Sequence, residues 1–148
     1  MLAVILIMLF ALPNELWIMN AFKLAPSPEA DRVIMALRVV AGLGLVAFPL
    51  NRLVLKRLLA IVETVRKGDP FVAANASRLQ TIAWAMLGLQ VLSMVIGGIA
   101  TAVNTPATPV KLDAGMSLNG WLAVLLTFLL ARVFAEGARM RDDLEGTV

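Results

Sequence analysis

Very few side chains in this 148-residue chain could do catalytic chemistry. It contains no Cys, His or Tyr, which excludes disulfides, thiol nucleophiles, histidine-based triads and the commonest zinc and haem ligands. The carboxylates are scattered, and no two are spaced as an acid and a base that face one cavity. We therefore expect no catalytic residues, no metal site, no cofactor and no enzyme.

Glu15 is the carboxylate with the clearest place in a mechanism, because it lies within a long apolar stretch. Charge inside a membrane marks a functional site by default, and a proton- or cation-coupled transporter needs a carboxylate that can lose its proton. Glu15 could equally sit at the outer membrane surface and pair with Arg38 or Lys23. A small transporter or permeation protein using Glu15 is therefore an alternative function.

The composition is that of an integral membrane protein. Hydrophobic residues make up 60% of the chain and charged residues 16%, against about 45–50% and 25% in soluble domains. The mean hydropathy is +0.87. A net charge of +3 is too small to suggest direct binding of nucleic acid. The bilayer is the first partner that the sequence predicts.

Four windows are long enough to cross roughly 30 Å of hydrocarbon. They cover about residues 1–22, 33–55, 80–103 and 116–134, in a single transmembrane domain of residues 1–148. Residues 56–79 form the central loop and residues 135–148 the tail. We expect an all-α protein, a four-helix transmembrane bundle with both termini on the same side.

The distribution of Lys and Arg predicts the orientation. Central loop and tail together carry Arg52, Lys56, Arg57, Arg66, Lys67, Arg78, Arg132, Arg139 and Arg141, whereas the opposite side carries Lys23, Arg32, Arg38 and Lys111. Because the side richer in basic residues faces the cytoplasm, we expect both termini of this multi-pass protein to be cytoplasmic.

Spans two and four are predicted to extend into the cytoplasm. After span two, apolar residues continue at the helical spacing i, i+3, i+4, i+7 and i+10, namely Leu55, Leu58, Leu59, Val62 and Val65. Gly68 is a natural residue to end this helix. The extension could lie on anionic lipid headgroups or bind a cytosolic partner, and the sequence leaves both open.

The loop residues Gly68, Pro70, Phe71, Asn75 and Arg78 have the pattern of a rigid turn. Gly68 can adopt positive φ, Pro70 fixes its own φ, and Asn75 can cap the next helix. Phe71 could pack at the membrane surface or against span four, or be presented to a partner.

The tail residues Phe134, Glu136, Gly137, Arg139 and Asp143 complete a hypothetical partner-binding set. Within it, Glu136 and Arg139 are spaced as an i, i+3 ion pair.

The loop and tail resemble those of a family of small four-span bacterial inner-membrane proteins known only as a domain of unknown function. The loop from Gly68 to Leu79 is similar to its G-x-P-F-x-x-x-N-x-x-R-L pattern, and the stretch from Phe134 to Val148 to its ending, F-x-x-G-x-x-L-x-x-D-x-x-x-T-V, with Met140 where Leu is usual. Members are often encoded beside a small helix-turn-helix regulator. The resemblance therefore implies a membrane partner for a repressor.

Small and polar residues within the spans predict helix packing. Ser93, Gly97 and Thr101 recur every four residues in span three, and Gly42 and Gly44 offer a smooth patch on span two. These faces could pack within one chain or form a homodimer. Two further polar residues lie within spans: Gln90, which can hydrogen-bond across helices, and Arg38.

The sequence thus favours a regulatory or scaffolding membrane protein that binds a cytosolic or membrane partner through its loop and tail, and that could sequester a repressor. Besides the transporter, the other alternative is an accessory subunit of a larger membrane complex, with another membrane chain as its partner.

Overall fold

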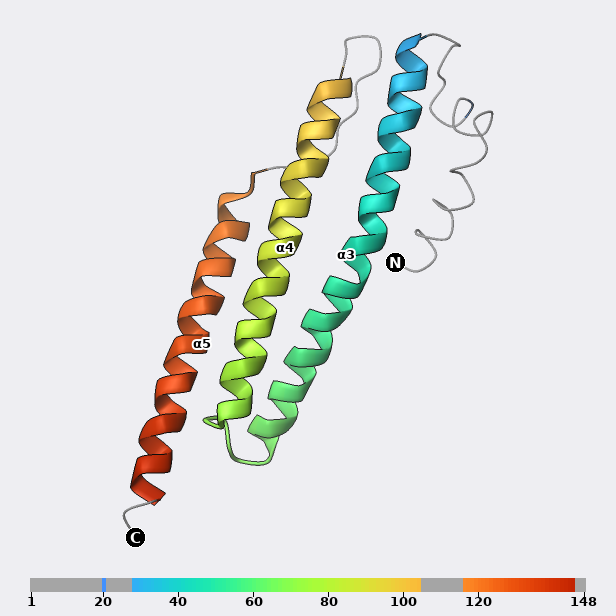
Figure 1. The fold of residues 1–148 in the computed structure, drawn as a ribbon. Coiled ribbons are helices and arrows are strands. Elements are labelled where there is room, and N and C mark those ends of the chain that lie inside the picture. The colour runs from blue at the N-terminus through green and yellow to red at the C-terminus, as the bar shows by residue number, and fades with distance from the viewer. Residues whose placement is uncertain (1–19, 21–27, 105–115, 146–148) are drawn as a thin grey trace. The chain divides into compact units, whose positions relative to one another are not determined.

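A computed structural model describes residue 20, residues 28–104 and residues 116–145 of the chain. Within the described parts of the chain, the ordered elements are three long helices: α3 (Pro28–Arg66), α4 (Ala73–Val103) and α5 (Leu118–Glu145) (Figure 1). The expected first span, residues 1–22, lies outside the described residues except for residue 20.

Helix α3 is far longer than a membrane span requires. It begins at Pro28; proline is favoured at the first helical position, because an amide there has no hydrogen-bond partner within the helix. The helix then continues through Pro49 to Arg66, over 39 residues in all. At 1.5 Å per residue this is about 58 Å, against roughly 30 Å of hydrocarbon. The predicted extension of the second span as a helix beyond residue 55 is therefore confirmed.

Helix α5 also runs on past its apolar part. Ser117 caps its start, because the Ser117 hydroxyl accepts a 3.2 Å hydrogen bond from the Gly120 amide. The helix then passes Arg132 without a break and ends at Glu145. The prediction that the fourth span continues as a helix into the tail is confirmed.

The chain divides into two compact units. The first contains residues Met1–Phe48 and Leu92–Met116, and the second contains Pro49–Val91 and Ser117–Val148. The first division falls inside α3 at Pro49, which cannot donate the usual backbone hydrogen bond.

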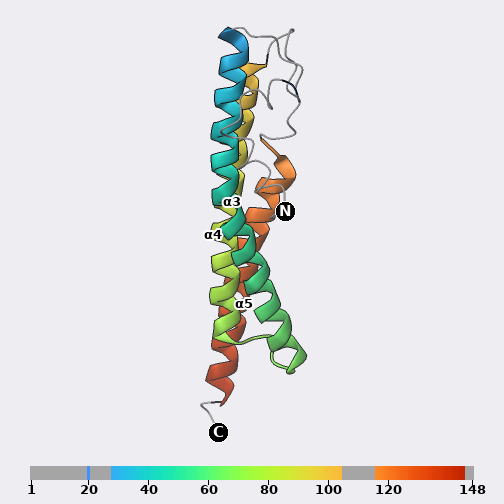
Figure 2. The ribbon, with the colours of Figure 1, turned by 90° about the vertical axis from the view of Figure 1, so that its right-hand side faces the viewer.

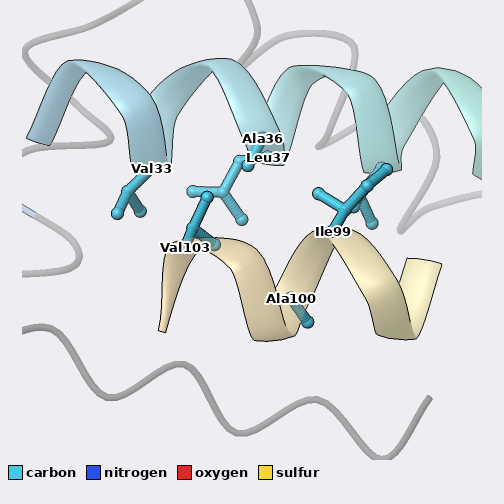
Figure 3. Close-up of a pocket in the computed structure, with 7 residues that line it drawn as sticks. Val33, Ala36, Leu37, Ile99, Ala100 and Val103 are labelled. Atoms are coloured by element: carbon cyan, nitrogen blue, oxygen red, sulfur yellow. The ribbon is translucent and has the colours of Figure 1, made fainter. Parts of the chain in front are cut away.

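In the first unit, the beginning of α3 packs against the end of α4. The facing side chains enclose a small apolar hollow lined by Val33, Ala36, Leu37, Val40, Ile99, Ala100 and Val103 (Figure 3). The four α3 residues follow the spacing i, i+3, i+4, i+7, which places them on one face of the helix.

In the second unit, α5 lies beside the first half of α4 (Figures 1 and 2). Val124, Ala131 and Ala138 recur every seven residues along α5 and are buried, as are Ile82 and Ala83 on α4. A small-residue face on α5 thus packs onto α4.

Three contacts show how the helices align in this unit. The rings of Trp84 and Phe128 lie 5.3 Å apart in an edge-to-face arrangement, which links α4 to α5. The Gly88 backbone approaches Leu50 of α3, whose Cδ1 would lie 3.6 Å from a Cβ at Gly88. Arg78 reaches the backbone of Ala60 farther along α3.

Candidate functional site: the α3–α4 turn and the tail of α5

The turn between α3 and α4 has a defined hydrogen-bond pattern. Gly68 has φ = 87°, in the left-handed region. Its amide donates to the Val65 carbonyl at 2.9 Å, and the Asp69 amide donates to the Thr64 carbonyl at 3.4 Å. These two bonds form a Schellman motif with Gly68 at C′, which confirms the predicted end of the helix. Pro70 follows, where it cannot continue the helix.

Replacing Gly68 with alanine is expected to destabilise the protein by about 1–2 kcal/mol, because a Cβ is strained at positive φ. Among the described residues, no neighbour lies within 4 Å of the position a Cβ would occupy, so the cost comes from the backbone. Gly42→Ala is a matched control inside α3 and is expected to be neutral or stabilising. Thermal unfolding in detergent measures both, and equal stability of Gly68→Ala and the parent would contradict the prediction.

Asn75 and Arg78 tie the start of α4 to the end of α3. The Asn75 side chain is fully buried; its Nδ2 donates to the Pro70 carbonyl at 2.9 Å, and its Oδ1 accepts a bond from Arg78 at 2.7 Å. The same Arg78 nitrogen donates to the Thr64 hydroxyl at 2.7 Å and to the Ala60 carbonyl at 3.1 Å. These hydrogen bonds hold the end of α3, the turn and the start of α4 together.

The structure corrects the predicted role of Asn75. Helix α4 begins at Ala73, so Asn75 lies within its first turn and is not the capping residue. Its carboxamide reaches back to Pro70 and across to Arg78 instead of bonding the first free amides of the helix. The buried amide is thus a bridge between the turn and Arg78.

Phe71 joins the turn to α5. Its ring lies 5.2 Å from the ring of Phe134 at an interplanar angle of 40°. It also covers Gly137, where a Cβ would lie only 2.8 Å from the Phe71 Cδ1. The packing of Phe71 against the fourth predicted span is confirmed, although 43% of the residue remains exposed.

An ion pair that the sequence analysis missed adds to this junction. The Arg141 guanidinium donates to the Asp69 carboxylate, linking residues that are 72 positions apart. Both side chains are partly exposed, at 43% and 34%, so solvent screens the pair and its contribution to stability is small. The only sign of this pair in the sequence is that the loop motif carries an acidic residue, Asp69, and the tail motif a basic one, Arg141.

The part of α5 beyond Arg132 keeps one face exposed. Val133, Met140 and Leu144 are 53%, 57% and 72% exposed, and their spacing of seven and four residues places them on one side of the helix. The charged residues Glu136, Arg139 and Asp143 are also exposed, with Arg139 and Glu136 forming the predicted pair at 3.7 Å. We call these six residues the tail surface.

The predicted partner-binding set therefore separates into two groups. Gly68, Pro70, Asn75 and Arg78 build the turn, and Phe71, Phe134 and Gly137 join it to α5. Glu136, Arg139 and Asp143 remain on the tail surface, where another molecule can reach them.

The other polar and small residues singled out lie apart from this junction. Gln90 donates a long, 3.5 Å bond to the Ser117 carbonyl and packs over Gly120, so its predicted contact across helices is confirmed. Arg38 is half-buried on α3. Glu15 lies outside the described residues.

The predicted packing glycines differ in their surroundings. Gly97 is buried and Ser93 half-buried, whereas Thr101 is exposed and bonds locally to the Gly98 carbonyl. At Gly42 and Gly44, no described neighbour lies within 4 Å of a Cβ position. In the first unit, α3 meets α4 through the valine-rich face around Val33 and Val40.

Residues 28–104 and 116–145 contain no group of three acidic side chains that could hold a metal ion. All three described helices are long and apolar enough to cross a membrane, with mean hydropathies of 2.2, 1.9 and 1.8 over their most apolar stretches. The fold thus defines an all-helical, multi-pass membrane protein.

The whole chain, residues 1–148, matches the family model described as "Protein of unknown function (DUF2975)", and the protein belongs to this family. No curated protein and no solved structure matches it.

Proposed function

We propose that this protein is a non-enzymatic regulatory protein of the bacterial inner membrane, and that its tail surface binds a cytosolic partner. The observation that carries the proposal is the exposed apolar and charged face of α5 beyond Arg132, on a segment that Phe71 and Asp69 join to a rigid turn. In this proposal the chain has four spans with both termini in the cytoplasm, as the excess of basic residues at this end favours.

The tail surface has the composition of a protein interface. Large apolar side chains such as Met140 and Leu144 supply contact area, and the charged residues beside them supply selectivity. Apolar side chains exposed on one helix face beyond a membrane span mark a site for a partner. A surface fixed to a rigid turn also loses less conformational entropy on binding.

The partner we propose is a small helix-turn-helix repressor. Support comes from the resemblance of the loop and tail to a family whose members are often encoded beside such a regulator. Binding at the tail surface would compete with binding to operator DNA, so the membrane protein would sequester the repressor. This mechanism needs no catalytic group in the membrane protein.

Arg139→Glu is expected to weaken retention of the repressor at least tenfold, because it reverses an exposed charge on the proposed binding surface. The measurement is co-purification of the neighbouring helix-turn-helix protein from native membranes in mild detergent, quantified by mass spectrometry. Phe71→Ala is a second variant that loosens the tail from the turn and should also release the partner.

Arg66→Glu is the matched control for charge reversal. Arg66 is 76% exposed and pairs with Glu63 at 3.5 Å, while Arg139 is 77% exposed and pairs with Glu136 at 3.7 Å; both pairs are spaced i, i+3. The control should retain the partner. Absence of a helix-turn-helix protein from the parent complex, or equal loss in Arg139→Glu and Arg66→Glu, would contradict the proposal.

A further inference from the structure

The second half of α3 carries a surface that neither the turn nor the tail uses. Its apolar stripe, Leu55, Leu58, Leu59, Val62 and Val65, is exposed, with exposed fractions of 43–70%. Beside it runs a charged stripe, Arg52, Lys56, Glu63 and Lys67, whose spacing of four, seven and four residues keeps it on one side of the helix.

The basic residues of this charged stripe differ in their partners. Lys67 lies 3.8 Å from Glu63, which also pairs with Arg66, so its charge is partly neutralised. Arg52 and Lys56 lie on successive turns and are exposed. Among the described residues, neither forms a salt bridge with a carboxylate. They form a local excess of two positive charges.

The contacts in the second unit place these two residues near an interfacial tryptophan. Leu50 lies against Gly88 and Ala60 against Arg78, so the part of α3 between them runs alongside the part of α4 that contains Trp84. Trp84 is 60% exposed. Exposed tryptophan is enriched at the boundary between hydrocarbon and headgroups, so we infer that Arg52 and Lys56, at the same level along the helices, lie near the phosphates of a leaflet.

We propose that Arg52 and Lys56 bind the phosphate of an anionic phospholipid. The charge is complementary, since a phosphodiester is negative and the two cations have no carboxylate partner among the described residues. Long Arg and Lys side chains reach the headgroup level while their stems stay in apolar surroundings.

The test uses the full-length protein with Trp17 and Trp121 replaced by phenylalanine, so that Trp84 is the fluorescent reporter. Brominated phosphatidylglycerol and brominated phosphatidylcholine are titrated in mixed micelles, and quenching gives the relative affinity for the two lipids. The parent should prefer phosphatidylglycerol. In the double variant Arg52→Gln, Lys56→Gln this preference should fall roughly 30-fold, because each cation contributes about 1 kcal/mol and every 1.4 kcal/mol is tenfold.

The double variant Arg66→Gln, Lys67→Gln is the matched control, because it removes two exposed cations that already share Glu63. It should keep most of the preference. Unchanged quenching by phosphatidylcholine in every variant shows that the fold is intact. The proposal is overturned if the parent shows no preference, if the control loses as much as the test variant, or if inorganic phosphate at millimolar concentration abolishes the preference.

Discussion

Asn75→Leu is expected to lower the free energy of unfolding by about 2–3 kcal/mol, which is a large effect for a single side chain. The substitution leaves the partly buried Pro70 carbonyl without its donor and removes one acceptor from Arg78. A buried polar group that loses its partner costs about 1–3 kcal/mol, and bonds to charged groups contribute more than neutral ones. Leucine has the same branched arrangement of four side-chain heavy atoms, so the loss is mainly one of hydrogen bonds.

Thermal unfolding in detergent, followed by circular dichroism, measures this loss. Gln80→Leu is the matched control, because Gln80 is an exposed amide farther along α4, and it should change stability by less than about 0.5 kcal/mol. Thr64→Val in the Asn75→Leu background should add little, since both changes act on the same network around Arg78. If the stability losses of Thr64→Val and Asn75→Leu were fully additive, the hydrogen bonds around Arg78 would act independently of one another.

Gly137→Leu is expected to displace Phe71 from α5 and to cost about 1–3 kcal/mol, the usual cost of over-packing. Even a Cβ at this position would lie 2.8 Å from the Phe71 ring, and the neighbouring ring of Phe134 limits how far Phe71 can turn aside. Leucine has a higher helix propensity than glycine, so any loss of stability in this variant must come from the contact with Phe71. The α3–α4 turn should then separate from the tail.

Amide hydrogen exchange at residues 132–145 and thermal unfolding both report on this separation. Gly88→Ala is the control, because its Cβ would meet Leu50 at an ordinary 3.6 Å. In a Phe71→Ala background, Gly137→Leu should lose most of its cost, since the ring it displaces is absent. An equal cost in both backgrounds would mean that the contact does not hold the tail.

Local sequence patterns predicted the three described helices and the end of α3. Composition and the long uncharged stretches predicted apolar helices of membrane-spanning length. Gly68 correctly predicted the end of α3, because positive φ at C′ is a local backbone requirement that one residue type meets best. For Phe71 the sequence left three positions open, and the structure shows the one against α5.

Residues whose roles depend on how the hairpin closes could not be predicted in this way. Asn75 has a capping side chain, yet its partners are Pro70 and Arg78, which the turn geometry brings to it. The roles of Thr64 and of the Asp69–Arg141 pair likewise depend on which helix faces meet. Gly42 and Gly44 predicted a close helix contact, and among the described residues no side chain lies close enough to test it.

The hydrogen bonds around Arg78 also bear on the order of assembly. Its partners Asn75, Thr64 and Ala60 lie 3, 14 and 18 residues away, so all of them leave the ribosome before α5 is made. Contacts between residues close in sequence form early, because little loop entropy is lost. We therefore expect α3 and α4 to enter the bilayer as a preformed hairpin, onto which α5 docks last.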